Sequence, residues 1–376
     1  MTRFVHTADW QLGMTRHYLD PEAQARFTAA RIEAIRSIGF LARTEGCSFV
    51  VVCGDVFETN QVARQVVVRA LDAMAGTPEV RFYLLPGNHD PLDASSVFRS
   101  PTFVGHQPGN VIVLDGGAPA CVEPGVELVA APWFTKRPLS DLVAEATGAL
   151  AADGTKRIVV GHGAVDALSP DVTNPALISL AGLESSLAAG RIHFVALGDR
   201  HSTTRIGSSG RIWYSGAPEP TDYDESDPGN VLLVELGDRE ASVEARRVGR
   251  WRFLAETFDV SGPDDCHRLE LYLDAIADKA RTVVKLALVG QLSLADKVSL
   301  DALLHHHSDL LAALDTWASR NDLIVLPDEE DFGVLGLSGF AREAFDDLRS
   351  LASGEEPTAV VARDALGLLY RLGSAR

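Results

Sequence analysis

The sequence contains few cysteines and no long apolar run. Its four cysteines, Cys47, Cys53, Cys121 and Cys266, are widely spaced and form no C-x-x-C pair. We therefore expect free thiols rather than a disulfide framework or a zinc ribbon. The N-terminal residues include no apolar stretch suited to a signal peptide, and no run of about 18 apolar residues occurs that could cross a membrane. These absences predict a cytoplasmic protein without membrane association.

Positive charge is also scarce. The 34 Lys and Arg residues stand against 52 Asp and Glu residues, which gives a net charge of −18. Proteins that bind a nucleic-acid backbone usually present a basic surface, so binding here would depend on local patches or on bound metals. The densest basic segment contains Arg246, Arg247, Arg250 and Arg252. It is interpreted most simply as an exposed strand or linker with solvated charges, and alternatively as a phosphate-binding patch.

The length and composition indicate a soluble protein of two domains. A chain of 376 residues is too long for one compact core, and 46% apolar with 23% charged residues is an ordinary globular composition. The pattern changes character near residues 251–262, so we predict a first domain at 1–254 and a small α/β domain at 255–376. In the second domain we predict helices at 264–279, 294–317, 339–352 and 358–372, strands at 282–289 and 323–326, and an acidic turn at 327–331.

Short β-rich runs alternate with helical patterns in the first domain. Helices are predicted at about 21–44 and 61–75, between the first three strands. This βαβαβ order, with several runs apolar throughout, predicts a sheet covered on both faces by helices. The predicted strands are 4–7, 49–53, 80–85, 111–114, 128–131, 158–160, 194–197, 212–215 and 231–235.

Five polar clusters each follow one of these strands. Ligand sites in open α/β sheets lie beyond the carboxyl ends of the strands, so the clusters should converge on one rim. Carboxylate, imidazole and amide groups together suit Mn, Fe or Zn. Two cations about 4 Å apart need a bridging anion, for which Asp55 is the natural candidate, while His89 should lie beside the substrate. The clusters are Asp9-Trp10-Gln11, Gly54-Asp55, Gly87-Asn88-His89-Asp90, Gly161-His162 and Gly198-Asp199-Arg200-His201.

The order of these clusters resembles the calcineurin-like metallophosphoesterase superfamily. Within it, HTADWQLG, GDVFE, LPGNHD and WYSGAPEP resemble the SbcD-type DNA double-strand-break repair nucleases, over about residues 4–220. The resemblance implies an α/β fold, a four-layer β-sandwich flanked by helices, followed by a small C-terminal α/β domain. It also implies a metal-dependent DNA exonuclease or endonuclease acting in DNA repair. Such nucleases form homodimers and use C-terminal helices to dock on an SMC-like ABC ATPase of SbcC type.

The resemblance further assigns roles to individual residues. His89 would be the catalytic residue, oriented by Asp90, and the loop Tyr214-Ser215-Gly216-Ala217-Pro218 would help to position the phosphate backbone. Two divalent ions would be bound, with Asp55 shared between them. The ligands of the first would be Asp9, Gln11, Asp55 and His201, and those of the second Asp55, Asn88, His162 and Asp199.

Three positions depart from the pattern of the repair nucleases. Gln11 and Asp199 replace histidines among the ligands, and Glu58 stands where those nucleases have another histidine. Oxygen ligands in place of imidazole favour Mn, with Mg as the alternative, over Fe or Zn. Gln11 and Asp199 could instead lie beside the site without binding metal. The departures leave two other functions open: a phosphoesterase for cyclic nucleotides or phosphomonoesters, and a catalytically impaired scaffold that binds DNA ends.

Overall fold

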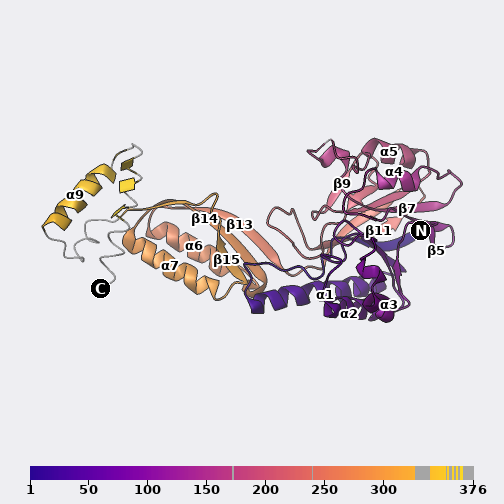
Figure 1. Ribbon diagram of the computed structural model, residues 1–376, viewed down its shortest axis with the longest axis horizontal. Coiled ribbons are helices and arrows are strands. Elements are labelled where there is room, and N and C mark those ends of the chain that lie inside the picture. Colours follow the sequence, from indigo (N-terminus) through magenta and orange to yellow (C-terminus); the bar gives the residue numbers. More distant parts are fainter. Residues whose placement is uncertain are drawn as a thin grey trace. The chain divides into compact units, whose positions relative to one another are not determined.

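The chain folds into two compact units, which are described separately (Figure 1). The computed structural model describes residues 1–171, 173–238, 240–326, 339–352, 354, 358–359, 361–362 and 365–366. The first unit consists of Met1–His17 and Gln24–Trp251, and the second of Tyr18–Ala23 and Arg252–Arg376. The acidic turn predicted at 327–331 and most of the helix predicted at 358–372 lie outside the described residues. Within the described ranges, no helix has the length and apolar character needed to cross a membrane.

The first sheet of the first unit has six strands in the order β12-β11-β1-β2-β3-β4. Strands β1 to β4 are parallel to one another, while β11 is antiparallel to both β1 and β12. Helix α1 (Pro21–Thr44) connects β1 to β2, and α2 (Arg64–Ala75) connects β2 to β3, as predicted. The strands are β1 (Thr2–Thr7), β2 (Phe49–Cys53), β3 (Arg81–Leu85), β4 (Val111–Val113), β11 (Asn230–Leu236) and β12 (Ala241–Arg247).

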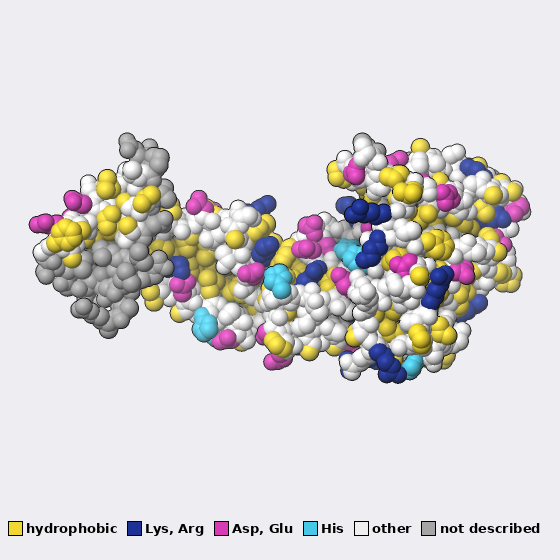
Figure 2. Space-filling model, in the orientation of Figure 1, with side chains coloured by type: hydrophobic (Ala, Val, Ile, Leu, Met, Phe, Trp, Pro, Cys, Tyr) yellow, Lys and Arg dark blue, Asp and Glu magenta, His cyan; other side chains and the backbone are white. Residues whose placement is uncertain are grey.

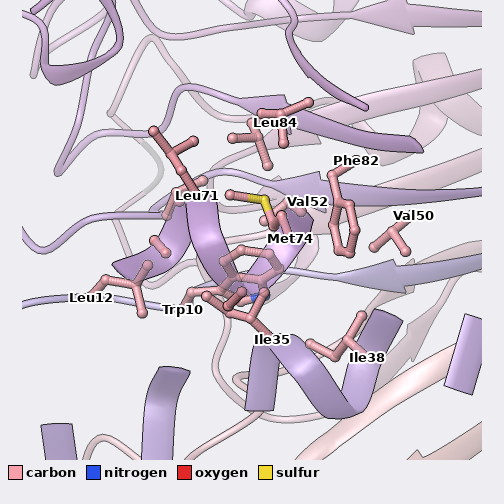
Figure 3. Close-up of a cluster of buried hydrophobic side chains, with 14 of the residues drawn as sticks. Trp10, Leu12, Ile35, Ile38, Val50, Val52, Leu71, Met74, Phe82 and Leu84 are labelled. Carbon is pink, nitrogen blue, oxygen red and sulfur yellow. The ribbon is translucent and has the colours of Figure 1, made fainter. Parts of the chain in front are cut away.

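One face of this sheet packs on helices. Alternate residues of a strand point to opposite faces, so Val50 and Val52 of β2 face α1 and α2 while Phe49 and Val51 face the other way. Each large apolar side chain buried here stabilises the fold by about 1.5–3 kcal/mol. Figure 3 labels ten members of the cluster: Trp10, Leu12, Ile35, Ile38, Val50, Val52, Leu71, Met74, Phe82 and Leu84.

The other face of the first sheet packs on a second six-stranded sheet, in the order β5-β6-β7-β8-β10-β9. Phe4 and Phe49 stack with ring centroids 5.2 Å apart, and Phe194 of the second sheet meets Phe4 edge-on at 5.6 Å. The strands are β5 (Ala120–Glu123), β6 (Val126–Ala130), β7 (Lys156–His162), β8 (Phe194–Gly198), β9 (Thr204–Ile206) and β10 (Ile212–Tyr214). The expectation that helices cover both faces of the first sheet is therefore wrong. The sequence of a strand that is apolar on both faces does not distinguish a face covered by helices from a face covered by a second sheet.

Helices also cover the outer face of the second sheet. Helix α4 (Leu142–Thr147) and α5 (Leu180–Ala188) contribute Val143, Leu183 and Leu187 to a cluster with that sheet. In Figure 1 these helices lie above the sheets, and α1, α2 and α3 (Pro101–His106) lie below them. The four layers are helix, sheet, sheet and helix, which confirms the four-layer architecture that the resemblance implied.

The second unit is a small α/β structure built on a parallel sheet. Strand β14 (Thr282–Ser293) pairs with β13 (Arg252–Val260), β15 (Ala313–Thr316) and β16 (Asp322–Leu326). The helices are α6 (Pro263–Ala275), α7 (Leu294–Ser308) and α9 (Phe340–Ala352). The helix predicted at 294–317 is wrong beyond Ser308, because residues 313–316 pair with β14 and tertiary contacts override local helical propensity.

Candidate metal centre

The loops that follow β1 and β2 are joined by backbone hydrogen bonds. The N–H of Asp9 donates to the carbonyl oxygen of Gly54 at 3.1 Å, and the N–H of Gln11 donates to that of Asp55 at 2.9 Å. The second sheet contributes at the same place, since Asp199 donates its N–H to both carboxylate oxygens of Asp9 at 3.1 Å. Polar clusters far apart in the sequence therefore meet at one rim, as expected from their positions after the ends of strands.

Four of the residues predicted to bind metal have a strained backbone. The angle φ is 54° at Asp9, 44° at Gln11, 52° at Asp55 and 97° at Asp199. Non-glycine residues rarely adopt positive φ, and such conformations cost about 1–3 kcal/mol each, so they persist where the surrounding structure imposes them and often mark functional sites. The four strained residues together mark this rim as the candidate functional site of the first unit.

Three acidic and imidazole side chains form the buried core of the site. Asp9, Asp55 and His162 each offer a ligand atom within 4.8 Å of the others, and all three are buried. The Nε2 atom of His162 lies 3.5 Å from Asp55 Oδ1 and 2.7 Å from Asn88 Oδ1. Asp199 Oδ1 lies 3.9 Å from the same nitrogen. The side chains predicted to bind the second ion thus lie close together: Asp55, Asn88, His162 and Asp199.

The other predicted set meets around His201. The side-chain Nε2 of Gln11 lies 3.1 Å from Nε2 of His201, and Gln11 is buried. Rotating the amide by half a turn would place its oxygen in the same position, where it could act as a ligand. Asp9 interacts electrostatically with His201, His162, Asp55 and Asp199, so the two sets are contiguous.

His89 is held differently from the expectation. Its backbone N–H donates to Asp55 Oδ1 at 2.9 Å, and its ring Nδ1–H donates to the carbonyl oxygen of Glu58 at 3.0 Å. Asp90 does not orient the ring, because its carboxylate accepts the N–H groups of Gly87 and Phe57 at 2.8 and 2.9 Å. Asp90 instead fixes the loop that carries Asn88 and His89. The group that orients the ring of His89 is therefore the Glu58 carbonyl, and the prediction that Asp90 orients it is corrected.

The site concentrates negative charge in a buried volume. Burial raises the pKa of Asp9 to about 7 even though His201 and His162 lie nearby. Burial alone would lower the pKa of His162, but the carboxylates of Asp55, Asp9 and Asp199 outweigh it and raise that pKa well above its usual value. His162 thus lies among carboxylates at the point where the donor atoms converge. This donor set of carboxylate, imidazole and amide groups fits divalent cations.

Two residues that sequence reasoning missed fix the orientation of His201. Its Nδ1–H lies 3.0 Å from Glu225 Oε1 and 2.6 Å from Thr221 Oγ1, and the Glu225 side chain is 4% exposed. Glu225 also accepts the backbone N–H of Thr221 at 3.0 Å. Carboxylates that accept the second N–H of a metal-binding histidine set its tautomer and ring orientation. Glu225 lies in the acidic run TDYDE, where nothing in the residue pattern separates it from its neighbours.

Trp133 forms a wall of the site. Its Nε1–H donates to the carbonyl oxygen of His162 at 2.8 Å, and the two rings meet edge-on at 5.9 Å. Its backbone N–H donates to Pro86 at 3.1 Å, next to the loop that carries His89. The loop at Tyr214-Ser215-Gly216-Ala217-Pro218 lies beside His201, since Ala217 donates its N–H to the His201 carbonyl at 3.0 Å.

Replacing Glu225 by alanine should weaken metal binding, because His201 would lose the acceptor that keeps its Nδ1 protonated and its Nε2 available. We expect a loss of about 10–100-fold in Mn affinity, measured by calorimetry. Glu225→Gln keeps an oxygen acceptor and should recover most of that loss. Equal affinity in wild type and Glu225→Ala would contradict the role.

Gly198 allows the two sheets to approach closely at the site. A Cβ atom at this position would lie 1.9 Å from the Cys53 carbonyl oxygen and 2.8 Å from Ala8 Cβ. Gly198→Ala should therefore destabilise the first unit by about 1–3 kcal/mol or more, seen as a lower melting temperature. Gly105→Ala is the matched control, because a Cβ there meets nothing within 4 Å, and it should not lower the melting temperature, since alanine is favoured over glycine in a helix.

Comparisons with known proteins identify the relatives of this chain. The model of the calcineurin-like phosphoesterase family matches residues 2–218. The chain is 27% identical over 282 residues to the D subunit of the SbcCD nuclease of Rhodobacter capsulatus, covering 62% of this chain and 67% of that protein. Among solved structures, TT1561 of Thermus thermophilus aligns with a TM-score of 0.41 and 11% identity, over 66% of this chain and 99% of the other. A dimetal phosphatase of Danio rerio aligns with a TM-score of 0.41 and 13% identity, over 66% of this chain and 96% of the other.

Proposed function

The chain belongs to the calcineurin-like phosphoesterase family and is a metal-dependent phosphoesterase, and from this premise we propose that it cleaves the phosphodiester bonds of DNA. The observation that carries the proposal is the convergence of Asp9, Asp55 and His162 at one buried point, with His89 beside it. The likeness to a protein named as part of a nuclease favours DNA among phosphodiesters.

We assign the metal ligands as two overlapping sets. One ion would be held by Asp9, Gln11, Asp55 and His201, and the other by Asp55, Asn88, His162 and Asp199. Bound at these positions, the cations supply Lewis-acid stabilisation of the charge on the phosphate oxygens. Asn88, Gln11 and the aspartates give more oxygen than nitrogen donors, so we propose Mn²⁺ as the native metal, with Mg²⁺ as the alternative.

His89 is the residue we propose to act on the substrate directly. Its side chain is 38% exposed, which lets it reach a bound phosphodiester, and its Nε2 lies 4.0 Å from Asp55 Oδ2. Because Nδ1–H is committed to the Glu58 carbonyl, Nε2 is the atom that faces the reaction. A protonated Nε2 can donate to a non-bridging oxygen or protonate the leaving oxygen of the cleaved strand.

The terminal helices of the second unit are proposed to cap that unit and to dock a partner. Helix α9 buries Phe345 against Ala352, Ala362 and Leu366, while Phe340 and Leu351 remain exposed. Exposed apolar side chains on an amphipathic helix are suited to a hydrophobic groove of another protein. The name of the Rhodobacter relative, a subunit of SbcCD, supports an SbcC-type partner. From the resemblance of the motifs we further propose that this partner is an ABC ATPase and that a homodimer of this chain is the working form in DNA repair.

Cleavage assays on defined DNA test the proposal. The protein with Mn²⁺ should shorten linear duplexes or open hairpins, alone or with an SbcC-type ATPase, and should lose this activity in EDTA. Absence of cleavage under every condition would refute the nuclease assignment. Two tightly bound ions per chain, counted by anomalous scattering, would support both ligand sets and count against an impaired scaffold.

A small-molecule phosphoesterase is the second candidate, and Glu58 favours it. Glu58 Oε1 lies 4.0 Å from His89 Nδ1, so this position places negative charge beside the residue that would meet a polyanionic substrate. Turnover of cyclic nucleotides or phosphomonoesters without any action on DNA would decide for this candidate.

A further inference from the structure

A hollow lined by arginines lies between α1 and residues 246–250. Its volume is about 720 Å³, and Arg36, Phe40, Arg246, Arg247 and Arg250 contribute to its walls. None of the described residues that line it is acidic. All of them belong to the first unit. We call this hollow the arginine groove.

The four arginines differ in how their charge is compensated. Arg36 pairs with Asp72 at 3.6 Å and also with Glu33, and Arg246 pairs with Glu244 at 2.9 Å and Glu45 at 3.6 Å. These acids lie outside the lining of the groove.

Arg247 and Arg250 are the two arginines of the groove without a carboxylate ion pair among the described residues, and the charge of Arg247 interacts with the buried Glu219 only at longer range. Arg247 donates to the Pro228 carbonyl at 3.2 Å, and the exposed Arg250 is fixed through its backbone N–H, which donates to Glu219 at 3.0 Å. Within the part of the chain that the structure describes, neither guanidinium forms an ion pair with a carboxylate. The groove therefore offers an anion two guanidinium groups that no carboxylate pairs within 4.0 Å.

Phe40 places an aromatic surface beside these charges. Its side chain is 58% exposed, and the guanidinium of Arg43 lies 5.1 Å from its ring centroid. An exposed aromatic ring next to arginines offers a stacking platform for a nucleic-acid base, and such stacking is independent of sequence.

The groove is linked to the metal centre by one short loop. Glu219, which is buried, accepts the N–H groups of Arg250 and Trp251 at 3.0 Å. Two residues further on, Thr221 contacts the ring of His201 at 2.6 Å. A chain of fixed contacts thus runs from the groove to a proposed metal ligand.

We propose that the arginine groove binds the phosphodiester backbone of single-stranded DNA, with one base stacked on Phe40. Guanidinium groups match phosphate oxygens in paired hydrogen bonds. The molecule as a whole disfavours a polyanion, because its net charge is −18 and the face shown in Figure 2 intersperses acidic with basic side chains over the first unit. Binding of DNA must therefore depend on a local basic site, and the arginine groove is such a site. This inference rests on the proposed action on DNA and adds that a single strand is held outside the metal centre.

The charge of the groove is tested by Arg247→Gln together with Arg250→Gln. Binding of a labelled oligo-dT is measured by fluorescence anisotropy in EDTA, where no cleavage can occur. We expect roughly tenfold weaker binding, and a slope of log K against log salt reduced by about 0.7 for each arginine. The matched control is Arg69→Gln with Arg99→Gln, two exposed arginines outside the groove, which should leave affinity and slope as in the wild type.

Phe40 is tested separately because it should act through stacking. Phe40→Ala and Phe40→Leu should each weaken oligo-dT binding by about tenfold, while Phe40→Trp should retain it. Duplex DNA, whose bases are already stacked, should bind equally well to all three. Because the Phe40 side chain is largely exposed, all three variants should fold, and unchanged melting temperatures would show this.

Two outcomes would overturn the proposal. The first is an affinity and a salt slope that are unchanged in the double arginine variant. The second is release of the oligonucleotide by millimolar inorganic phosphate, which would show that the groove binds free anions. Cleavage assays separate this failure from failure of the proposed function. If the wild type cleaves DNA and the double variant binds it normally, the groove fails alone. If oligo-dT binds at the groove but no DNA is cleaved, the nuclease assignment fails and the groove stands.

Discussion

Asp55→Asn is expected to remove bound metal and to lower the phosphodiesterase rate by about a thousandfold or more. Asp55 is the only proposed ligand shared by both ions, and it lies 3.5 Å from His162 and accepts the N–H of His89 at 2.9 Å. Asparagine keeps an oxygen acceptor for that N–H, so the loop should hold its shape while the bridging charge is lost. Metal content by elemental analysis and turnover of a model phosphodiester with Mn²⁺ measure the two effects.

The control for this variant is Asp115→Asn. Asp115 accepts the N–H of Gly117 at 3.1 Å in an exposed turn and belongs to no proposed ligand set. It should keep full metal content and full rate. Retention of two ions by Asp55→Asn, with activity near that of the wild type, would show that another group bridges the metals.

His89→Ala is expected to lower kcat by about 10²–10⁴-fold while both ions remain bound. The ring donates to a backbone carbonyl and is partly exposed, so its removal leaves no buried charge and should change the melting temperature little. Rates with Mn²⁺ and metal content should be measured on the same preparations.

His106→Ala is the matched control for His89. His106 is exposed on α3, where its ring likewise bonds a backbone carbonyl, that of Thr102 at 2.8 Å. Loss of metal from His89→Ala would make His89 a ligand rather than the residue acting on the substrate. A rate equal to that of His106→Ala would remove His89 from the reaction altogether.

Much of the site could be predicted because its residues lie in short motifs at strand ends. Asp9, Asp55, Asn88, His89 and His162 each follow or end an apolar strand, and parallel strands bring their carboxyl ends to one edge. Strand periodicity and motif order are local properties, so they can be read without knowing what packs on the sheet. The role of Asp90 could not be read in this way, because its partners, the N–H groups of Gly87 and Phe57, are set by how two loops meet.

The sequence by itself determined the βαβαβ start, the family and the set of polar side chains that gather at the rim. Tertiary structure decided what covers the inner face of the first sheet. Strand β2 carries apolar side chains on both faces, and only the packing shows that one face contacts a second sheet. It also decided that Glu225 orients His201 and that Arg250 borders a hollow with Phe40. The residues of each pair are at least 24 positions apart in the sequence and lie in loops or helices. No periodicity of the sequence predicts which of their side chains come into contact.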